Sequence, residues 1–311
     1  MQGKSHEDFK CQKLSVDTWE EKVDMESDNI NIVDCYTGED EMEEVEDEKY
    51  LGDIISKDGK NLKNIKARVN KRKGIVARIM SLLDGIPFGK YCFEVAVILR
   101  NSLLVSSLLC NSEAWYNVSN SELNYLESVD LMFLRSVLKA PKSTPKEMLF
   151  LELGCIPLRD IIQKRRLSFL QYILQEDETS MMYRFLEAQM KTKHPKDWAN
   201  TVIKDFEELK LNLTFAEIKK MKKNTFKTIL RQSIEVNTLK KLNSIKEGHS
   251  KVKQLQHKTS QMRKYFKPNS ENPSKEIVQL IFKLRCKVTD SKLNYKGLYD
   301  NLECEACGIE K

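Results

Sequence analysis

The sequence predicts a mainly α-helical protein: a multi-helix bundle preceded by a small antiparallel β segment. Glycine and proline are scarce, with 11 and 7 in 311 residues, which disfavours β-sandwiches and barrels. From about residue 60 onward, apolar residues recur at helical spacing. Ser/Thr-x-x-Glu patterns at Ser119–Glu122 and Thr214–Glu217 are typical of helix N-termini because each end can satisfy a free backbone N–H. Thr144-Pro145-Lys146-Glu147 predicts another helix start, with Thr144 as the N-cap and Pro145 at the first helical position.

Charge is distributed unevenly along the chain. Residues 1–50 hold 17 acidic and 5 basic side chains, a net of −12, and subtracting this from the total of +6 leaves +18 for residues 51–311. A surplus of this size attracts polyanions such as nucleic acid. The alternative is a lysine-rich helical surface whose charges serve only for hydration.

The N-terminal β segment is predicted over residues 1–60. Short strand-like runs occupy residues 9–16, 30–36 and the stretch that begins at Tyr50. An acidic segment, residues 39–48, is expected to form a loop or a frayed helix. Asp58-Gly59 is a strong turn signal because glycine tolerates positive φ.

The first long helix is predicted from Lys60 to Leu83, with an apolar stripe on one face. Its cations make it the best nucleic-acid candidate in the chain, and a second basic cluster is expected to project from a helix over residues 158–174. The candidate nucleic-acid-binding residues are Lys63, Lys66, Arg68, Lys71, Arg72, Lys73 and Arg78 in the first helix and Lys164, Arg165 and Arg166 in the second.

An apolar helix is predicted from Tyr91 to Cys110, buried on nearly every face; Arg100 within it argues against a membrane span. The helix that follows Ser119 extends to Leu138 and carries Asp130 on its apolar stripe. A buried acid needs a partner, and Arg100 is the charge available in the neighbouring apolar helix. We therefore expect a structural ion pair between them.

Further helices are predicted over residues 183–190 and 198–209, followed by a lysine-rich segment, 219–267, that forms an exposed helix or an arm. A last helix starts near Ser274 and is expected to pack through Ile277, Leu280, Ile281 and Leu284. These patterns divide the chain into an acidic β segment (1–60), a helical domain (61–175), a lysine-rich helical region (176–267) and a C-terminal segment (268–311).

Sequence motifs of common active sites are absent: there is no Gly-rich phosphate loop, no H-E-x-x-H and no G-x-S-x-G, and the four histidines are scattered. Eight cysteines with one close pair are typical of an intracellular protein with reduced thiols. That pair, Cys304 and Cys307, has the spacing of half a tetrahedral zinc site, and coincidental free thiols are the alternative.

Several segments together resemble the C-terminal part of the reverse transcriptase, an RNA-directed DNA polymerase, of non-LTR (LINE or jockey-like) retrotransposons. The likeness covers most of the chain and is carried by K-Y-L-G at 49–52, I-I-S-K-D-G-K at 54–60, N-S-E-A-W-Y at 111–116, S-T-P-K-E at 143–147, L-E-L-G at 151–154 and R-R-L-x-F-L at 165–170.

This resemblance implies a thumb-like helical domain after the primer grip, which residues 10–16 resemble, and a CCHC zinc knuckle of which Cys304 and Cys307 would be the first half. It implies RNA or an RNA/DNA hybrid as the partner and the nucleus as the compartment. The family's paired aspartates, which would hold Mg²⁺ for nucleotidyl transfer, match nothing here, so Mg²⁺ is expected only in a full-length parent.

We therefore expect a non-catalytic fragment of such an enzyme that retains affinity for RNA or RNA/DNA, with no membrane association. The alternative is a helical protein-interaction scaffold, or a remnant without function. The sequence leaves open whether a longer polyprotein contains this chain, and it does not identify protein partners.

Overall fold

The computed structural model describes residues 36–37, 40–41, 45–50, 52–86, 93–116, 118–244, 261–266, 274–286 and 288. The chain forms two compact units, Met1–Glu46 and Asp47–Lys311. In the first unit, β1 (Tyr36–Thr37) pairs antiparallel with β2 (Asp40–Glu41). The predicted strand at 9–16 lies outside the described residues, as does the strand predicted at 30–36 except for Tyr36, which begins β1. The four-segment division of the chain stays a prediction.

The second unit begins with a β-hairpin. Strand β3 (Asp47–Tyr50) pairs antiparallel with β4 (Asp53–Ser56), and Gly52, with φ 92°, lies in the turn between them. The predicted turn at Asp58-Gly59 is confirmed: Gly59 has φ 64° and its backbone N–H donates to Ser56 O at 2.9 Å. This second turn leads the chain directly into the first helix.

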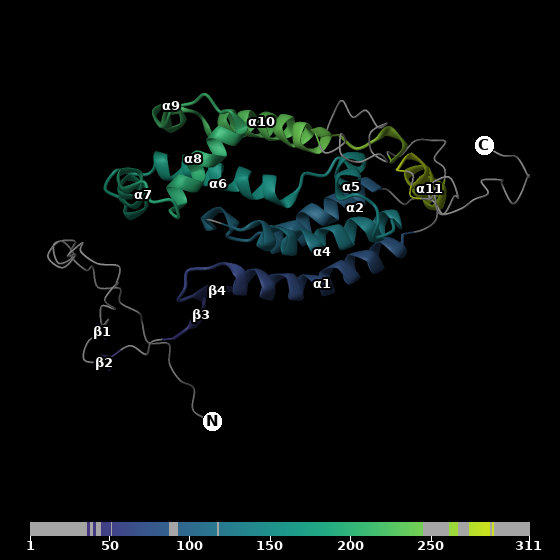
Figure 1. Ribbon diagram of the computed structural model, residues 1–311, viewed down its shortest axis with the longest axis horizontal. Helices are drawn as coiled ribbons and strands as arrows, with labels where there is room; N and C mark the ends of the chain where they lie inside the picture. The colour runs from purple at the N-terminus through teal and green to yellow at the C-terminus, as the bar shows by residue number, and fades with distance from the viewer. Residues whose placement is uncertain are drawn as a thin grey trace, which may run out of the picture. The chain divides into compact units, whose positions relative to one another are not determined.

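Helix α1 (Leu62–Asp84) lies beside α4 (Asn120–Leu138), and the two pack through apolar stripes (Figure 1). The α1 stripe consists of Ile65, Val69, Val76, Ile79 and Leu83, all buried. The capping box predicted for α4 is confirmed, since Ser119 N donates to Glu122 Oε2 at 2.8 Å and Glu122 N donates to Ser119 Oγ at 3.2 Å. The predicted helix from Ser119 to Leu138 is therefore correct.

The predicted apolar helix is a continuous helical stretch made of α2 (Phe93–Leu99), a π-helical segment (Arg100–Val105) and α3 (Ser106–Leu108). The expectation that it is buried on nearly every face is wrong, because Ile98 is 62% and Leu103 43% exposed. The ion pair predicted between Arg100 and Asp130 is confirmed: Arg100 Nε donates to Asp130 Oδ1 at 2.6 Å, and both side chains are buried.

The remaining helices complete two hydrophobic cores. They are α5 (Lys146–Leu153), α6 (Leu158–Gln175), α7 (Met181–Thr192), α8 (Trp198–Leu209), α9 (Phe215–Lys220), α10 (Lys223–Ser244) and α11 (Lys275–Arg285), with the 3₁₀ turns Ser112–Ala114 and Lys264–Phe266. The first core lies among α1 to α5 and takes in α11, whereas the second lies among α6 to α10. Helix α6 contributes to both, and α10 lies along it (Figure 1).

Helix α11 packs through a different face from the one predicted. Its buried residues are Val278, Gln279 and Phe282. Of the residues predicted to pack, Ile281 is half-buried, whereas Ile277, Leu280 and Leu284 are about half exposed. Both faces of this helix carry apolar residues at helical spacing, so periodicity alone did not distinguish them. Gln279 settles the orientation, because its Nε2 donates to Val137 O of α4 at 2.8 Å.

Candidate nucleic-acid interface

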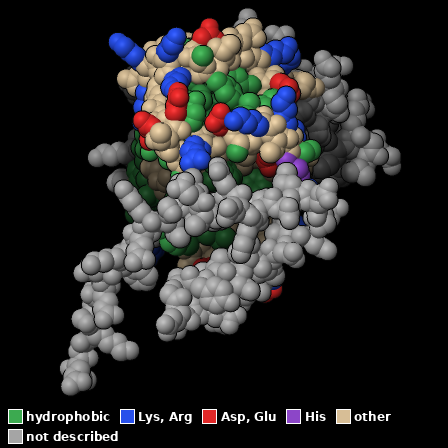
Figure 2. Space-filling view, turned by 90° about the vertical axis from the view of Figure 1, so that its left-hand side faces the viewer, with side chains coloured by type: hydrophobic (Ala, Val, Ile, Leu, Met, Phe, Trp, Pro, Cys, Tyr) green, Lys and Arg blue, Asp and Glu red, His purple; other side chains and the backbone are tan. Residues whose placement is uncertain are grey.

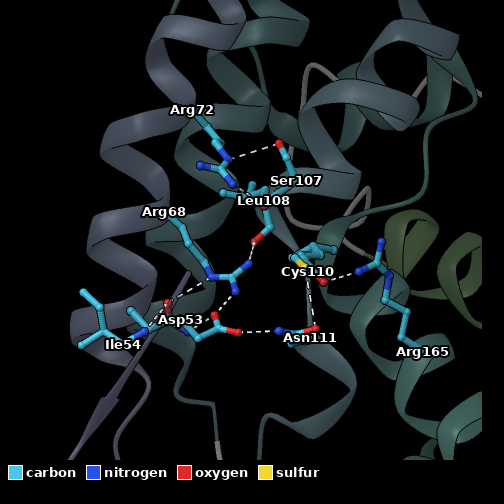
Figure 3. Close-up of polar contacts among 11 residues, drawn as sticks. Asp53, Ile54, Arg68, Arg72, Ser107, Leu108, Cys110, Asn111 and Arg165 are labelled. Atoms are coloured by element: carbon cyan, nitrogen blue, oxygen red, sulfur yellow. Dashed lines mark hydrogen bonds and ion pairs between the residues drawn. The ribbon is translucent and has the colours of Figure 1, made fainter. Parts of the chain in front are cut away.

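Three of the predicted nucleic-acid-binding arginines converge on the C-terminal end of α3 (Figure 3). From α1, Arg72 Nη2 donates to Ser107 O at 2.9 Å and Arg68 Nη1 donates to Leu108 O at 3.3 Å. From α6, Arg165 donates to Leu109 O. The last carbonyls of a helix carry partial negative charge and lack intrahelical partners. The three guanidinium groups therefore cap this helix.

Asp53 of β4 completes this cluster (Figure 3). Its carboxylate forms an ion pair with Arg68 and accepts hydrogen bonds from Asn64 Nδ2 at 2.9 Å and Asn111 Nδ2 at 2.6 Å. Burial, together with the positive charge of Arg72 and Arg165, lowers the pKa of Arg68. The guanidinium also lies 5.4 Å from the centre of the Trp115 ring. Arg68 thus joins the hairpin, α1 and the turn after α3.

The second basic cluster is also largely internal. Arg166 is buried and forms an ion pair with Asp205 of α8 at 2.8 Å. Gln163 Nε2 donates to the other carboxylate oxygen of Asp205 at 3.2 Å. Burial raises the pKa of Asp205 to about 6, although Arg166 and Gln163 act in the opposite direction. Lys164 is half-buried, so these three cations do not project together as expected.

Helical position explains why these arginines point inward. Arg68 and Arg72 follow Ile65 and Val69 by three residues each, and residues three or four apart share a helix face. Both therefore lie on the apolar stripe of α1, as Arg166 does on α6 between Ile162 and Leu170. The sequence contained this signal, but each cation was assigned to the polar face by its charge alone.

The outer face of α1 carries the other predicted cations. Lys66 and Lys73 lie on one flank and Lys71 and Arg78 on the other, and all four are exposed. Each pair is seven residues apart, which is about 10.5 Å along a helix. Among the described residues, Lys66, Lys71 and Arg78 have no ion-pair partner, whereas Lys63 pairs with Asp47 at 2.7 Å.

Small side chains run between the two flanks. Asn70, Gly74, Ala77 and Ser81 are all exposed along the centre of this face. A Cβ added at Gly74 would meet no atom within 4 Å, so packing does not require glycine there. Glycine in a helix interior costs about 1 kcal/mol relative to alanine. The outer face of α1 is therefore a shallow track between two rows of cations.

A pocket of about 850 Å³ lies at the N-terminal end of α1, and residues of α6, α7 and α8 also line it. Its walls include the rings of Tyr116, Phe169, Phe185 and Trp198. Figure 2 looks onto the end of the molecule that carries α7, and shows exposed hydrophobic side chains among charged ones.

The described residues contain no group of three or more His, Cys, Asp or Glu side chains placed to hold a metal ion. Cys304 and Cys307 lie outside the described residues. Within the described part of the chain, no helix has the length and apolar character needed to cross a membrane.

Comparisons of the chain with protein-family models, with curated proteins and with solved structures found no match.

Proposed function

We propose that this chain binds the phosphate backbone of RNA or an RNA/DNA hybrid along the outer face of α1. The observation that carries the proposal is the charge of this helix. Its residues from Leu62 to Leu83 include no Asp or Glu, and the exposed cations Lys66, Lys71, Lys73 and Arg78 flank a track of small side chains. Lysine and arginine that neutralise phosphates release counterions, which drives binding of low sequence selectivity.

The choice of RNA or RNA/DNA, and of a thumb-like role in a non-LTR retrotransposon reverse transcriptase, rests on the resemblance of the sequence. The arrangement of the segments that carry the likeness supports it. Asn111 of N-S-E-A-W-Y donates to Asp53 beside K-Y-L-G, and Tyr116 Oη donates to Gly59 O at 3.2 Å. Segments distant in sequence thus form one unit that fixes the start of α1.

In this proposal the chain holds the nucleic acid without catalysing its synthesis. The inner arginines of α1 fix the helix on α3 and the hairpin, while the outer cations contact phosphates. Because the contacts are to the backbone, the chain positions a template and primer strand rather than reading its bases.

Fluorescence anisotropy with a labelled RNA/DNA hybrid tests this proposal on the full chain. Replacing Lys66, Lys71, Lys73 and Arg78 together by Ala should weaken binding at least tenfold for all sequences alike. A matched control replaces Lys220, Lys222, Lys223 and Lys227 by Ala; these cations of α9, of α10 and of the turn between them are also exposed. Equal affinity of the wild type and the α1 variant would refute the proposal.

A second candidate function is that of a protein-interaction scaffold. Exposed apolar residues on two helices favour it. In α11 these are Ile277, Leu280 and Leu284, and in α7 they are Met181 and Phe185. Apolar side chains that share an exposed helix face are typical of helix-mediated association. Analytical ultracentrifugation of the wild type and of Leu280→Glu would detect self-association through α11.

A further inference from the structure

The pocket at the N-terminal end of α1 has walls that are held in place before any ligand arrives. Trp198 Nε1 donates to Glu113 O at 2.8 Å, and the Trp198 ring meets Phe169 edge to face at 5.8 Å between centroids. The hydroxyl of Tyr116 donates a hydrogen bond to Gly59 O, so this ring is held in place as well. Phe185, by contrast, is 61% exposed at the rim.

The acidic side chains that line this pocket are already engaged within the protein. Asp58 accepts from Lys60 N at 3.0 Å, Glu122 belongs to the capping box of α4, and Asp197 accepts from Thr192 Oγ1 at 3.4 Å. Lys196, also in the lining, has no ion-pair partner among the described residues. The rim therefore offers a cation while its acids are occupied.

The pocket is also continuous with the start of α1. Lys60, Asn61 and Leu62 belong to its lining, and Lys66 lies about one turn further along the helix. No side chain caps the N-terminus of α1. A ligand in the pocket therefore lies at the end of the outer face of α1, next to the positive end of that helix.

We propose that this pocket takes the base of an unpaired nucleotide whose strand continues along the outer face of α1. The inference rests on the proposed function and specifies its partner: a strand with an unpaired nucleotide beside the bound duplex. A base has a planar apolar face that stacks on aromatic side chains, and its phosphate is an anion that Lys196 and the α1 N-terminus attract.

The first test examines the pocket separately from the outer face of α1. The full chain is titrated with adenosine 5′-monophosphate, a single nucleotide. The protein is labelled with ¹⁹F-tryptophan, which gives one signal each for Trp19, Trp115 and Trp198. The Trp198 signal, assigned with Trp198→Phe, should shift in a saturable manner, while that of buried Trp115 should not. Ribose 5-phosphate, which has the phosphate but no base, should leave the signals unchanged.

Rim variants locate the contact. Phe185→Ala and Lys196→Ala should each weaken the nucleotide response several-fold, and both residues are exposed enough for the fold to tolerate the change. Leu284→Ala, at an equally exposed apolar residue of α11, is the control and should have no effect. Equal shifts with ribose 5-phosphate would overturn the inference, because an anion site without base recognition would explain them.

An RNA/DNA hybrid with a single-stranded overhang separates this inference from the proposed function. A hybrid whose overhang carries bases should bind about tenfold more tightly than a blunt hybrid or a hybrid with an abasic overhang. Phe185→Ala should abolish this difference in affinity. If the overhang makes no difference while the α1 variant still loses affinity, the pocket inference fails and the proposed function stands. If no hybrid binds at all, both fail.

A competition experiment between an apolar dye and the nucleotide would show whether the pocket instead binds apolar ligands. The dye 8-anilinonaphthalene-1-sulfonate binds apolar pockets, and adenosine 5′-monophosphate should displace it from the Phe185-dependent site. Dye that binds there and is not displaced by the nucleotide would show a pocket for apolar ligands, which contradicts the inference.

Discussion

The inner and outer faces of α1 use the same kind of charge for different purposes. On the inner face, Arg68 and Arg72 are engaged with Asp53 and with the last carbonyls of α3. On the outer face, Lys66, Lys71 and Arg78 extend from the helix without an ion-pair partner among the described residues. A count of cations along this helix therefore overstates the charge available to a polyanion.

Side-chain chemistry follows this division except at Arg78, an exposed arginine of the outer face. The guanidinium group is planar, offers five donors and is more weakly hydrated than an ammonium group, so it suits a buried site with several acceptors. Lysine keeps its strongly hydrated charge in solvent. Helix α6 repeats the pattern, with Arg166 buried against Asp205 and Lys164 half-buried.

The largest effect is expected for Arg68→Ala, which leaves Asp53 partly buried without its cation. Breaking a buried ion pair costs about 3 kcal/mol in unfolding free energy, which urea denaturation would measure. Lys71→Ala, on the outer face, should change it by less than about 0.5 kcal/mol. A similar loss of unfolding free energy in both variants would contradict the conclusion that the inner face stabilises the fold and the outer face does not.

The burial of Asp205, the ion-pair partner of Arg166, predicts a pH effect. Because burial raises the pKa of Asp205 to about 6, the folded protein holds a proton that the unfolded chain releases near pH 4. This contribution to stability, about 3 kcal/mol, is fully present below pH 4 and is lost as pH rises through 6.

Denaturation of the wild type and Asp205→Asn from pH 3.5 to 7 isolates that contribution. The difference in unfolding free energy between the two proteins should change over this interval, and the Asp205 carboxyl carbon should titrate near pH 6 by NMR. Titration near pH 4 would show that the charge of Arg166 outweighs burial.

A smaller effect is expected for Arg72→Ala, which removes hydrogen bonds to Ser107 without leaving a buried acid unpaired. A hydrogen bond to a charged group contributes about 1.5 kcal/mol. Lys73→Ala, the adjacent outer-face substitution, is the matched control. Thermal unfolding of the two variants side by side would show whether capping of α3 by Arg72 stabilises the fold.

A small effect of the opposite sign is expected at Gly74, at the centre of the outer face. Gly74→Ala should stabilise the protein by about 0.5 to 1 kcal/mol, since the site is open and helical. Gly74→Glu should keep the fold but weaken hybrid binding, because it places a negative charge between the cation rows. Unchanged binding by Gly74→Glu would exclude the track as the contact.

The sequence predicted those elements whose signals are local. Ser119 and Glu122 gave the start of α4, and the placement of Arg100 and Asp130 on apolar stripes gave their ion pair. The Ser/Thr-x-x-Glu patterns at Ser119–Glu122 and Thr214–Glu217 form capping boxes in the structure, whereas Thr144-x-x-Glu147 does not, since the N-cap of α5 is Pro145.

Interactions that depend on tertiary packing were not predicted. The carbonyls that Arg68, Arg72 and Arg165 cap belong to a helix end whose position cannot be read from spacing. The two apolar faces of α11 differ in sequence too little to show which is buried. The aromatic pocket was missed because its walls come from segments far apart, around Tyr116, Phe169 and Trp198.

The most direct test of nucleic-acid binding by the outer face of α1 is the salt dependence of binding. Affinity for an RNA/DNA hybrid would be measured by anisotropy across a salt series for the wild type, the α1 variant lacking Lys66, Lys71, Lys73 and Arg78, and the α9–α10 control. Loss of these four cations should reduce the slope of log K against log salt by about 3.6, while the control keeps the wild-type slope. Equal slopes for the two variants would contradict the assignment of binding to this face.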